Sequence, residues 1–283
     1  MHRRQSLALI CAVGMVTALI VYFVIPVSPM RTAFNRDMRR FSSDQKFSID
    51  DVFTADDFAD FPKAVQKFAQ NSGLVGQPKM NYVKVTFQET DFKRSRTSNP
   101  LRISYTQYNF AARPTRLALI QTSMFGVPFE GYDYLKDGRG GMKGQLAKSI
   151  TLFHERGQIM DKAALCTYLA ESLLVPSALL NRSIDFEEIS SREVRATITS
   201  QGTSASGIFK FNEDFMFESF YTEDRAAVSD DGTIEYIPWT ANCSDHAVNK
   251  NGIIQPRSMS ATWNYPGEDF TYFDGRVDDI VYG

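Results

Sequence analysis

The chain has 283 residues, with 31 Lys and Arg against 33 Asp and Glu, and a formal net charge of −2 at pH 7. A balance this even produces no global field that would draw the protein to nucleic acid, so no nucleic-acid partner is expected. Three cysteines are too few for a disulfide framework.

The first predicted element is a membrane-spanning helix over Leu7–Ile25, within a stretch from Gln5 to Met30 that carries no charge. At about 1.5 Å per residue, such a helix matches the ~30 Å hydrocarbon core of a bilayer. The apolar run is longer than that of a cleaved signal peptide, and no small-x-small cleavage site follows it. We therefore expect an uncleaved signal anchor over residues 1–28, with the lipid bilayer as its partner.

Arginines flank this span on both sides, two before it and four within Arg31–Arg40. Counting Lys and Arg alone, the positive-inside rule favours a cytoplasmic domain. The short N-terminal tail favours the opposite orientation, because such tails usually stay inside. We adopt the second interpretation, a single-pass protein of the cytoplasmic (inner) membrane with an extracytoplasmic domain.

Residues 29–50 are expected to form a polar tether, and residues 51–283 a single β-rich soluble domain. Short helices are expected over 54–58 and 61–72. A longer helix is expected with Asp161 as its capping residue, and Pro176 is expected to end or kink it. From Met80 onward the apolar residues alternate with a period of two, as in half-buried antiparallel strands. After this first strand, further strands are predicted over 101–109, 116–122, 129–137, 142–153, 184–189, 194–200, 205–212, 216–223, 234–246, 253–263 and 270–282.

Helices do not alternate with these strands, which argues against a parallel α/β fold. The predicted fold class is mainly β (α+β): a single curved antiparallel sheet, or open half-barrel, with a few packing helices. The chain is also rich in aromatic residues, with 22 Phe and 12 Tyr. They fill a β-sheet core or line a ligand cavity.

No catalytic or metal motif is predicted from the candidate segments. Ser244, Asp245 and His246 have the residue types of a hydrolase triad, but consecutive strand residues point to opposite faces. His154 and His246 lie far apart, without metal-ligand spacing, so no metal and no cofactor is expected. Cys166 and Cys243 are expected as buried free thiols.

The glycine-rich run Gly138–Gly144 contains a lysine but lacks the Gly-Lys-Ser/Thr order of a phosphate-binding loop. It does not open a predicted helix either. We interpret it as a glycine-rich strand end or bulge.

Five segments together resemble an uncharacterised bacterial family of domains of unknown function, number 6544. They are FPKAVQKFAQNSGLVGQP (Phe61–Pro78), YTQYNF (Tyr105–Phe110), GYDYLKDGRGGM (Gly131–Met142), LAESLLVPSALL (Leu169–Leu180) and GIFKFNEDFMFESFYTEDR (Gly207–Arg225). The resemblance runs from about residue 52 to the C-terminus. The chain departs from the family pattern at Thr167-Tyr168 and Leu174-Val175. As a fold, we expect the lipoprotein-carrier-like open half-barrel.

The resemblance assigns no activity, but it marks four polar positions, Tyr134, Asp137, Arg139 and Glu171, as a ligand-binding or structural cluster. An ion pair between Glu171 and Arg139 is the structural account of two of them. The leading hypothesis is a membrane-anchored extracytoplasmic domain that binds an apolar or lipid-like ligand, with the amphipathic helix as a lid. The alternatives are a non-catalytic envelope or sensory scaffold with a filled core and, less favoured, a hydrolase built on the four polar residues.

Overall fold

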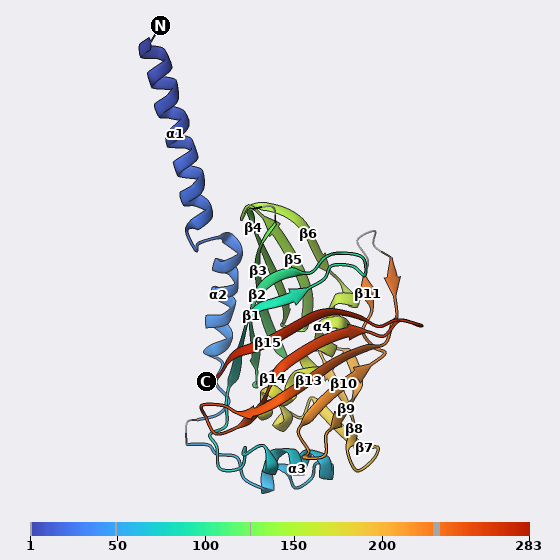
Figure 1. Cartoon of the computed structure of the whole chain (residues 1–283). Helices are drawn as coiled ribbons and strands as arrows, with labels where there is room; N and C mark the ends of the chain where they lie inside the picture. The colour runs from blue at the N-terminus through green and yellow to red at the C-terminus, as the bar shows by residue number, and fades with distance from the viewer. Residues whose placement is uncertain (1, 49, 125, 229–232) are drawn as a thin grey trace.

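A computed structural model describes the whole chain except residues 1, 49, 125 and 229–232. Over these residues the fold is one large curved antiparallel sheet with a few helices, open rather than closed into a barrel (Figure 1). Its thirteen strands follow the order β6-β5-β4-β3-β2-β1-β15-β14-β13-β10-β9-β8-β7. The predicted fold class is therefore confirmed.

The strands of this sheet are β1 (Tyr82–Phe92), β2 (Leu101–Phe110), β3 (Thr115–Met124), β4 (Val127–Lys136), β5 (Arg139–Leu146), β6 (Ile150–Arg156), β7 (Ile184–Glu188), β8 (Glu193–Ser200), β9 (Thr203–Phe211), β10 (Phe217–Thr222), β13 (Trp239–Val248), β14 (Ile254–Trp263) and β15 (Phe270–Tyr282). Two short strands, β11 (Ala227–Val228) and β12 (Ile234–Glu235), pair separately. The last strand, β15, closes the chain back against β1, so that the N- and C-terminal halves of the domain form one continuous sheet.

Two strands predicted from the alternation are wrong because each contains a break. The segment 142–153 is a hairpin of β5 and β6, whose turn places Ala147 and Lys148 at φ of 51° and 64°. The segment 234–246 divides into β12 and β13. In the first case the turn carries no Gly, Asn or Asp, the residues that favour left-handed backbone, so composition did not reveal it.

The concave face of the sheet holds the main core and helix α4 (Gln158–Ala170). The helix begins at Gln158, so Asp161 lies in its first turn and is not the capping residue that we predicted. Two 3-10 turns, η2 (Ser172–Leu174) and η3 (Pro176–Leu180), continue from it, and both are buried. Most of α4 is buried against the concave face of the sheet, so it is a core element. The prediction that this helix acts as a lid is therefore wrong.

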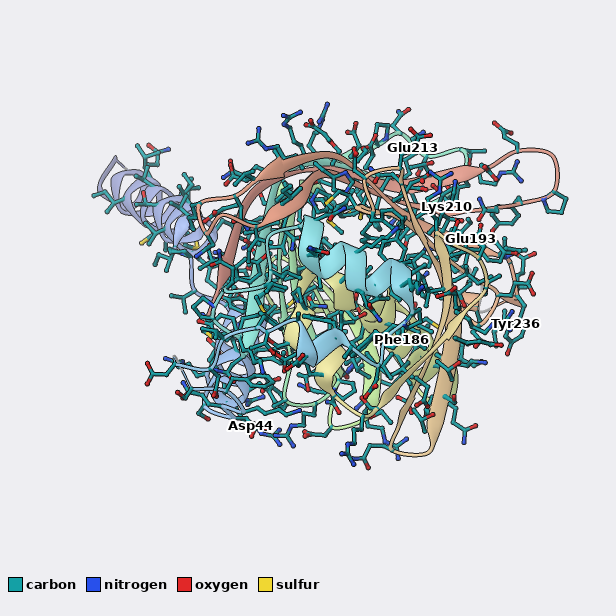
Figure 2. The ribbon with its side chains drawn as sticks, turned by 90° about the horizontal axis from the view of Figure 1, so that it is seen from below. Asp44, Phe186, Glu193, Lys210, Glu213 and Tyr236 are labelled. Carbon is teal, nitrogen blue, oxygen red and sulfur yellow. The ribbon has the colours of Figure 1, made fainter. Side chains whose placement is uncertain are left out.

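The lower end of the curved sheet is covered by the 3-10 helix η1 (Asp56–Phe58) and helix α3 (Lys63–Asn71). Seen from below, α3 crosses in front of this end, and Phe186, Glu193 and Lys210 lie along one rim (Figure 2). Helix α3 buries Val65 and Phe68 against the core, as its apolar stripe predicts. It therefore shields this end of the core from solvent.

The expected polar tether is wrong for residues 29–42, which form helix α2 (Pro29–Ser42) on the outer face of the sheet (Figure 1). Ser28 caps its first turn, and Met30, Phe34 and Phe41 pack against β2, β3 and β4. Arg31 adds an ion pair to the buried Glu130, with Nε 2.6 Å from Oε1. A narrow apolar stripe inside a charged segment was sufficient to dock the helix.

Helix α1 (His2–Val24) projects away from the domain (Figure 1). Among the described residues, this is the one helix long and apolar enough to cross a membrane. Its C-terminal end is held by the turn between β5 and β6. Lys148 donates hydrogen bonds to the carbonyls of Tyr22 and Ile25, and the Tyr22 hydroxyl donates to the carbonyl of Ala147 at 3.1 Å. Helix α1 is thus joined to the sheet by contacts as well as by the chain.

Candidate functional site

The candidate site is a cavity of about 160 Å³ on the concave side of the sheet, between α4 and the strands. Apolar side chains dominate its wall: Phe87, Phe92, Ile103, Tyr105, Ile120, Met142, Ala170, Phe217, Trp239, Ala241, Met259, Ala261, Tyr272 and Phe273. These residues come from strands at both ends of the chain, which the pairing of β1 with β15 brings together. The sheet curvature therefore creates the cavity.

One wall of the cavity carries a buried charged network centred on Arg116. Its Nε donates to Glu171 Oε2 at 2.7 Å, its Nη1 donates to Asp133 at 2.6 Å, and its Nη2 donates to the Tyr105 hydroxyl. Asn109 donates a further hydrogen bond to Glu171 at 2.8 Å. Every partner is thus supplied by the protein, which allows charge to be buried beside an apolar space.

The alternation along β3 explains why an arginine lies here. Arg116, Ala118 and Ile120 face the concave side, whereas Leu117 and Leu119 face α2. Burial alone would lower the pKa of Arg116, but the charges of Glu171, Tyr105 and Asp133 raise it well above its ordinary value. The guanidinium is therefore a permanent cation that anchors Glu171.

A second arginine, Arg225, lines the same cavity from the loop between β10 and β11. Its guanidinium carbon lies 4.9 Å from the ring centroid of both Trp239 and Trp263, the two tryptophans of the chain. The rings are side by side because these residues are register partners in β13 and β14. The Nε of Arg225 donates to Thr167 Oγ1 at 3.3 Å.

The neighbouring acid, Asp224, has other partners and does not neutralise Arg225. It accepts hydrogen bonds from Lys162 at 2.7 Å and from the backbone and hydroxyl of Ser206. Burial alone would raise the pKa of Asp224, but these hydrogen bonds outweigh burial and lower it. Of the residues that the structure describes, none places a carboxylate oxygen within 4 Å of Arg225.

The four polar residues marked by the family resemblance do not form one cluster. Tyr134 lies on the outer face under α2, in the group that contains Tyr132. Asp137 pairs with Arg40 of α2 at 2.8 Å. Only Glu171 of the four contributes to the cavity wall.

Arg139 is largely exposed and pairs with the buried Asp161 at 3.0 Å, whereas Glu171 pairs with Arg116. The expected Glu171–Arg139 ion pair is therefore wrong. A hydrolase built on the four residues required them to converge in one cleft, and their positions on two faces and in a turn contradict it.

The other sequence motifs have structural roles. The Ser244–His246 segment lies in β13, where Asp245 pairs with Arg276 and the His246 ring bonds to the Phe217 carbonyl at 2.8 Å. Within the described part of the chain, no group of three or more His, Cys, Asp or Glu could hold a metal ion. Cys166 and Cys243 are buried and unpaired, as we predicted.

Comparisons with known proteins place the chain in a family without assigning an activity. A model of a family of unknown function, DUF6544, matches residues 51–275. The chain therefore belongs to this family, and the resemblance inferred from the five segments is confirmed. A search of curated proteins returns no match.

Two solved structures are similar in part. One is a putative outer membrane lipoprotein-sorting protein domain from Vibrio parahaemolyticus, with 8% identity and a TM-score of 0.42 over 78% of this chain and 91% of that chain. The other is MucB in complex with MucA(peri), with 9% identity and a TM-score of 0.15 over 77% of this chain and 97% of that chain.

Sequence reasoning missed Arg116, Arg225 and the two tryptophans as site residues. Arg116 had a usable signal, since it is a charge at the start of an otherwise apolar strand, RLALI. Arg225 had none, because its position depends on a loop packing against strands that follow it in the chain. For Trp239 and Trp263, the one sequence signal was that they are the two tryptophans of the chain.

Proposed function

We propose that this protein is a membrane-anchored binding domain that holds the apolar part of a lipid-like molecule in the concave cavity. The observation that carries the proposal is the cavity wall, which is mostly aromatic and aliphatic, with its polar residues grouped around Arg116 and Arg225. The core around the cavity is otherwise filled. Transfer of an apolar group from water into a space of this composition is favourable. The membrane anchor places the domain beside a reservoir of such molecules.

The cavity size limits the ligand. An engineered cavity of about 150 Å³ takes up benzene, so a space of 160 Å³ accommodates a ring or a short stretch of alkyl chain. We therefore propose that one end of an apolar chain enters, with the remainder outside. A complete acyl chain requires the strands that line the cavity to move apart.

Native mass spectrometry of the full-length protein, purified gently from the membrane, tests this proposal. We expect a bound small molecule on the wild type and its loss from Ala241→Phe, which fills the cavity. Ala247→Phe is the matched control, because Ala247 lies on the same strand outside the cavity. A ligand-free wild type that also takes up no fluorescent fatty acid would overturn the proposal.

A second function, an envelope or sensory scaffold without a ligand, is favoured by the same volume. Ligand pockets usually exceed about 300 Å³, and the cavity is smaller. Fully buried Phe209, Phe211 and Phe220 show how completely the rest of the core is filled. The scaffold hypothesis predicts that Ala241→Phe stabilises the domain and leaves its cellular role intact.

We also propose that the domain is extracytoplasmic, with Leu7–Ile25 crossing the inner membrane. Arg3 and Arg4 before the span support this orientation, and the arginines of α2 oppose it. Protease added to intact spheroplasts should degrade the domain. Complete protection before lysis and digestion after it would show a cytoplasmic domain.

A further inference from the structure

We infer that Arg225, with Trp239 and Trp263 beneath it, is a binding site for the anionic head group of the ligand. This inference rests on the proposed function, since it names the class of molecule that the cavity takes. The ligand would be an amphiphile whose apolar end enters the cavity and whose carboxylate or phosphate contacts Arg225. The chemistry shared by both head groups is an oxyanion with two or more acceptor atoms.

The position of Arg225 supports a role in binding. It lines the cavity and is half-buried, so its charge is partly removed from water. The other arginine in the wall, Arg116, already contacts two carboxylates and a hydroxyl, so it is less able to bind the anion of a ligand. Nothing described in the structure saturates Arg225 in this way, because its one hydrogen bond, from Nε, goes to a hydroxyl.

The surroundings of Arg225 hold its guanidinium in place. The two indole rings lie 4.9 Å from the guanidinium carbon, within the range of cation–π attraction. The Trp239 Nε1 donates to the Tyr272 hydroxyl at 3.2 Å, and Tyr272 stacks on Trp263, which fixes both rings. A pre-positioned guanidinium loses little side-chain entropy when it binds an anion.

The planar guanidinium also suits the proposed head groups. Its N–H donors can form two parallel hydrogen bonds to one carboxylate or phosphate. The two ring centroids lie 4.9 Å from the guanidinium carbon, whereas these hydrogen bonds form at the N–H edge of the group. The cation and the apolar cavity wall therefore present the two kinds of surface that an anionic amphiphile needs.

Calorimetric titration of the full-length protein with four probes tests the inference: octanoate, octyl phosphate, octanol and inorganic phosphate. We expect both anionic octyl compounds to bind wild type at least about tenfold more tightly than octanol, as a charge-assisted hydrogen bond implies. Arg225→Gln should remove this difference, and Arg225→Lys should restore part of it. Arg195→Gln, which removes one exposed arginine from β8, should leave it unchanged.

The outcomes separate this inference from the proposed function. Octanol binding as tightly as octanoate would overturn the anion site and leave the cavity proposal standing. Another outcome is that inorganic phosphate binds as tightly as octyl phosphate and that its binding depends on Arg225. That result would support the anion site at Arg225 and would overturn the proposal that the cavity binds the apolar chain. Failure of all four probes to bind would overturn both.

Discussion

Glu171 and Arg116 form a buried ion pair across the concave face of the sheet, with Glu171 Oε2 2.7 Å from Arg116 Nε. Glu171 follows α4 directly and Arg116 is the second residue of β3, so the pair ties the central helix to the sheet. Both side chains are nearly inaccessible to water. Such a pair favours one arrangement of helix and sheet, because a displaced helix leaves the Glu171 carboxylate without its ion-pair partner, whereas Arg116 keeps Asp133.

Replacement of one partner should therefore be costly. Glu171→Leu is expected to lower the free energy of unfolding by up to about 3–5 kcal/mol, because Arg116 keeps its buried charge and loses one of its two carboxylate partners. The double variant Glu171→Leu with Arg116→Met should recover much of that loss. Urea denaturation measures both, and a double variant less stable than the single one would contradict this account.

The pair of the exposed Arg139 with the buried Asp161 is the matched control. Arg139→Ala should cost less than about 1 kcal/mol, since a solvent-exposed arginine gains little from an ion pair. The backbone N–H of Gly140 still donates to Asp161 at 2.7 Å after the substitution. A loss of stability equal to that of Glu171→Leu would show that the Arg139–Asp161 pair contributes as much to the free energy of unfolding as the Glu171–Arg116 pair, which contradicts this account.

Acid should weaken the attachment of α2 through Asp37. Burial alone would raise the pKa of this carboxyl, but the hydrogen bond and charge of Lys136, with further hydrogen bonds from Tyr132 and Arg36, outweigh burial and lower it. A lowered pKa means that Asp37 stabilises the fold above its unfolded pKa of about 3.9, and that this contribution is lost as pH falls through the folded pKa. Between pH 5 and pH 3, the free energy of unfolding should fall more steeply for wild type than for Asp37→Asn. Identical pH profiles would show that Asp37 does not hold the helix.

Gly140 should tolerate no side chain. A Cβ at this position would lie 2.1 Å from the backbone oxygen of Met160 and 2.8 Å from the Cβ of Ala164, so α4 would have to move. Gly140→Ala is therefore expected to destabilise the domain by more than about 3 kcal/mol, or to prevent folding. Gly202→Ala is the comparison, because Gly202 has open space but a φ of 81°, and should cost about 1–2 kcal/mol. Equal thermal stability of the two variants would contradict the close approach of α4 to β5.

The two buried thiols should be chemically inert in the folded domain. Burial raises the pKa of Cys166 to about 12 and raises that of Cys243 as well. The thiolate is the reactive form, so alkylation near neutral pH should be very slow. In a Cys11→Ser variant, iodoacetamide followed by mass spectrometry should label neither cysteine without denaturant and both in urea. Rapid labelling of the native protein would show that the core opens.

The sequence predicted the sheet better than it predicted the site. Strict alternation gave the last strand with the boundaries that the structure shows, Phe270–Tyr282. The same reasoning missed the turn at Ala147 and Lys148, since neither residue favours a left-handed backbone. Helix α2 was missed because its stripe of Met30, Phe34 and Phe41 is narrow and interrupted by arginines.

The site required information that no local pattern contains. Glu171 and Arg116 are 55 residues apart, and their contact depends on how α4 crosses β3. The expected partner, Arg139, is closer in sequence but lies outside the concave face. The family resemblance marked Glu171 as a polar position, but it could not indicate which arginine would reach it.

The most direct test of ligand binding uses the two tryptophans beside the cavity as reporters. Titration with 8-bromooctanoate should quench their fluorescence saturably in wild type and in the control Ala247→Phe, because bromine quenches on contact. The cavity-filling Ala241→Phe should lose this saturable component. Weak, non-saturating quenching that is identical in all three proteins would contradict a ligand cavity in this domain.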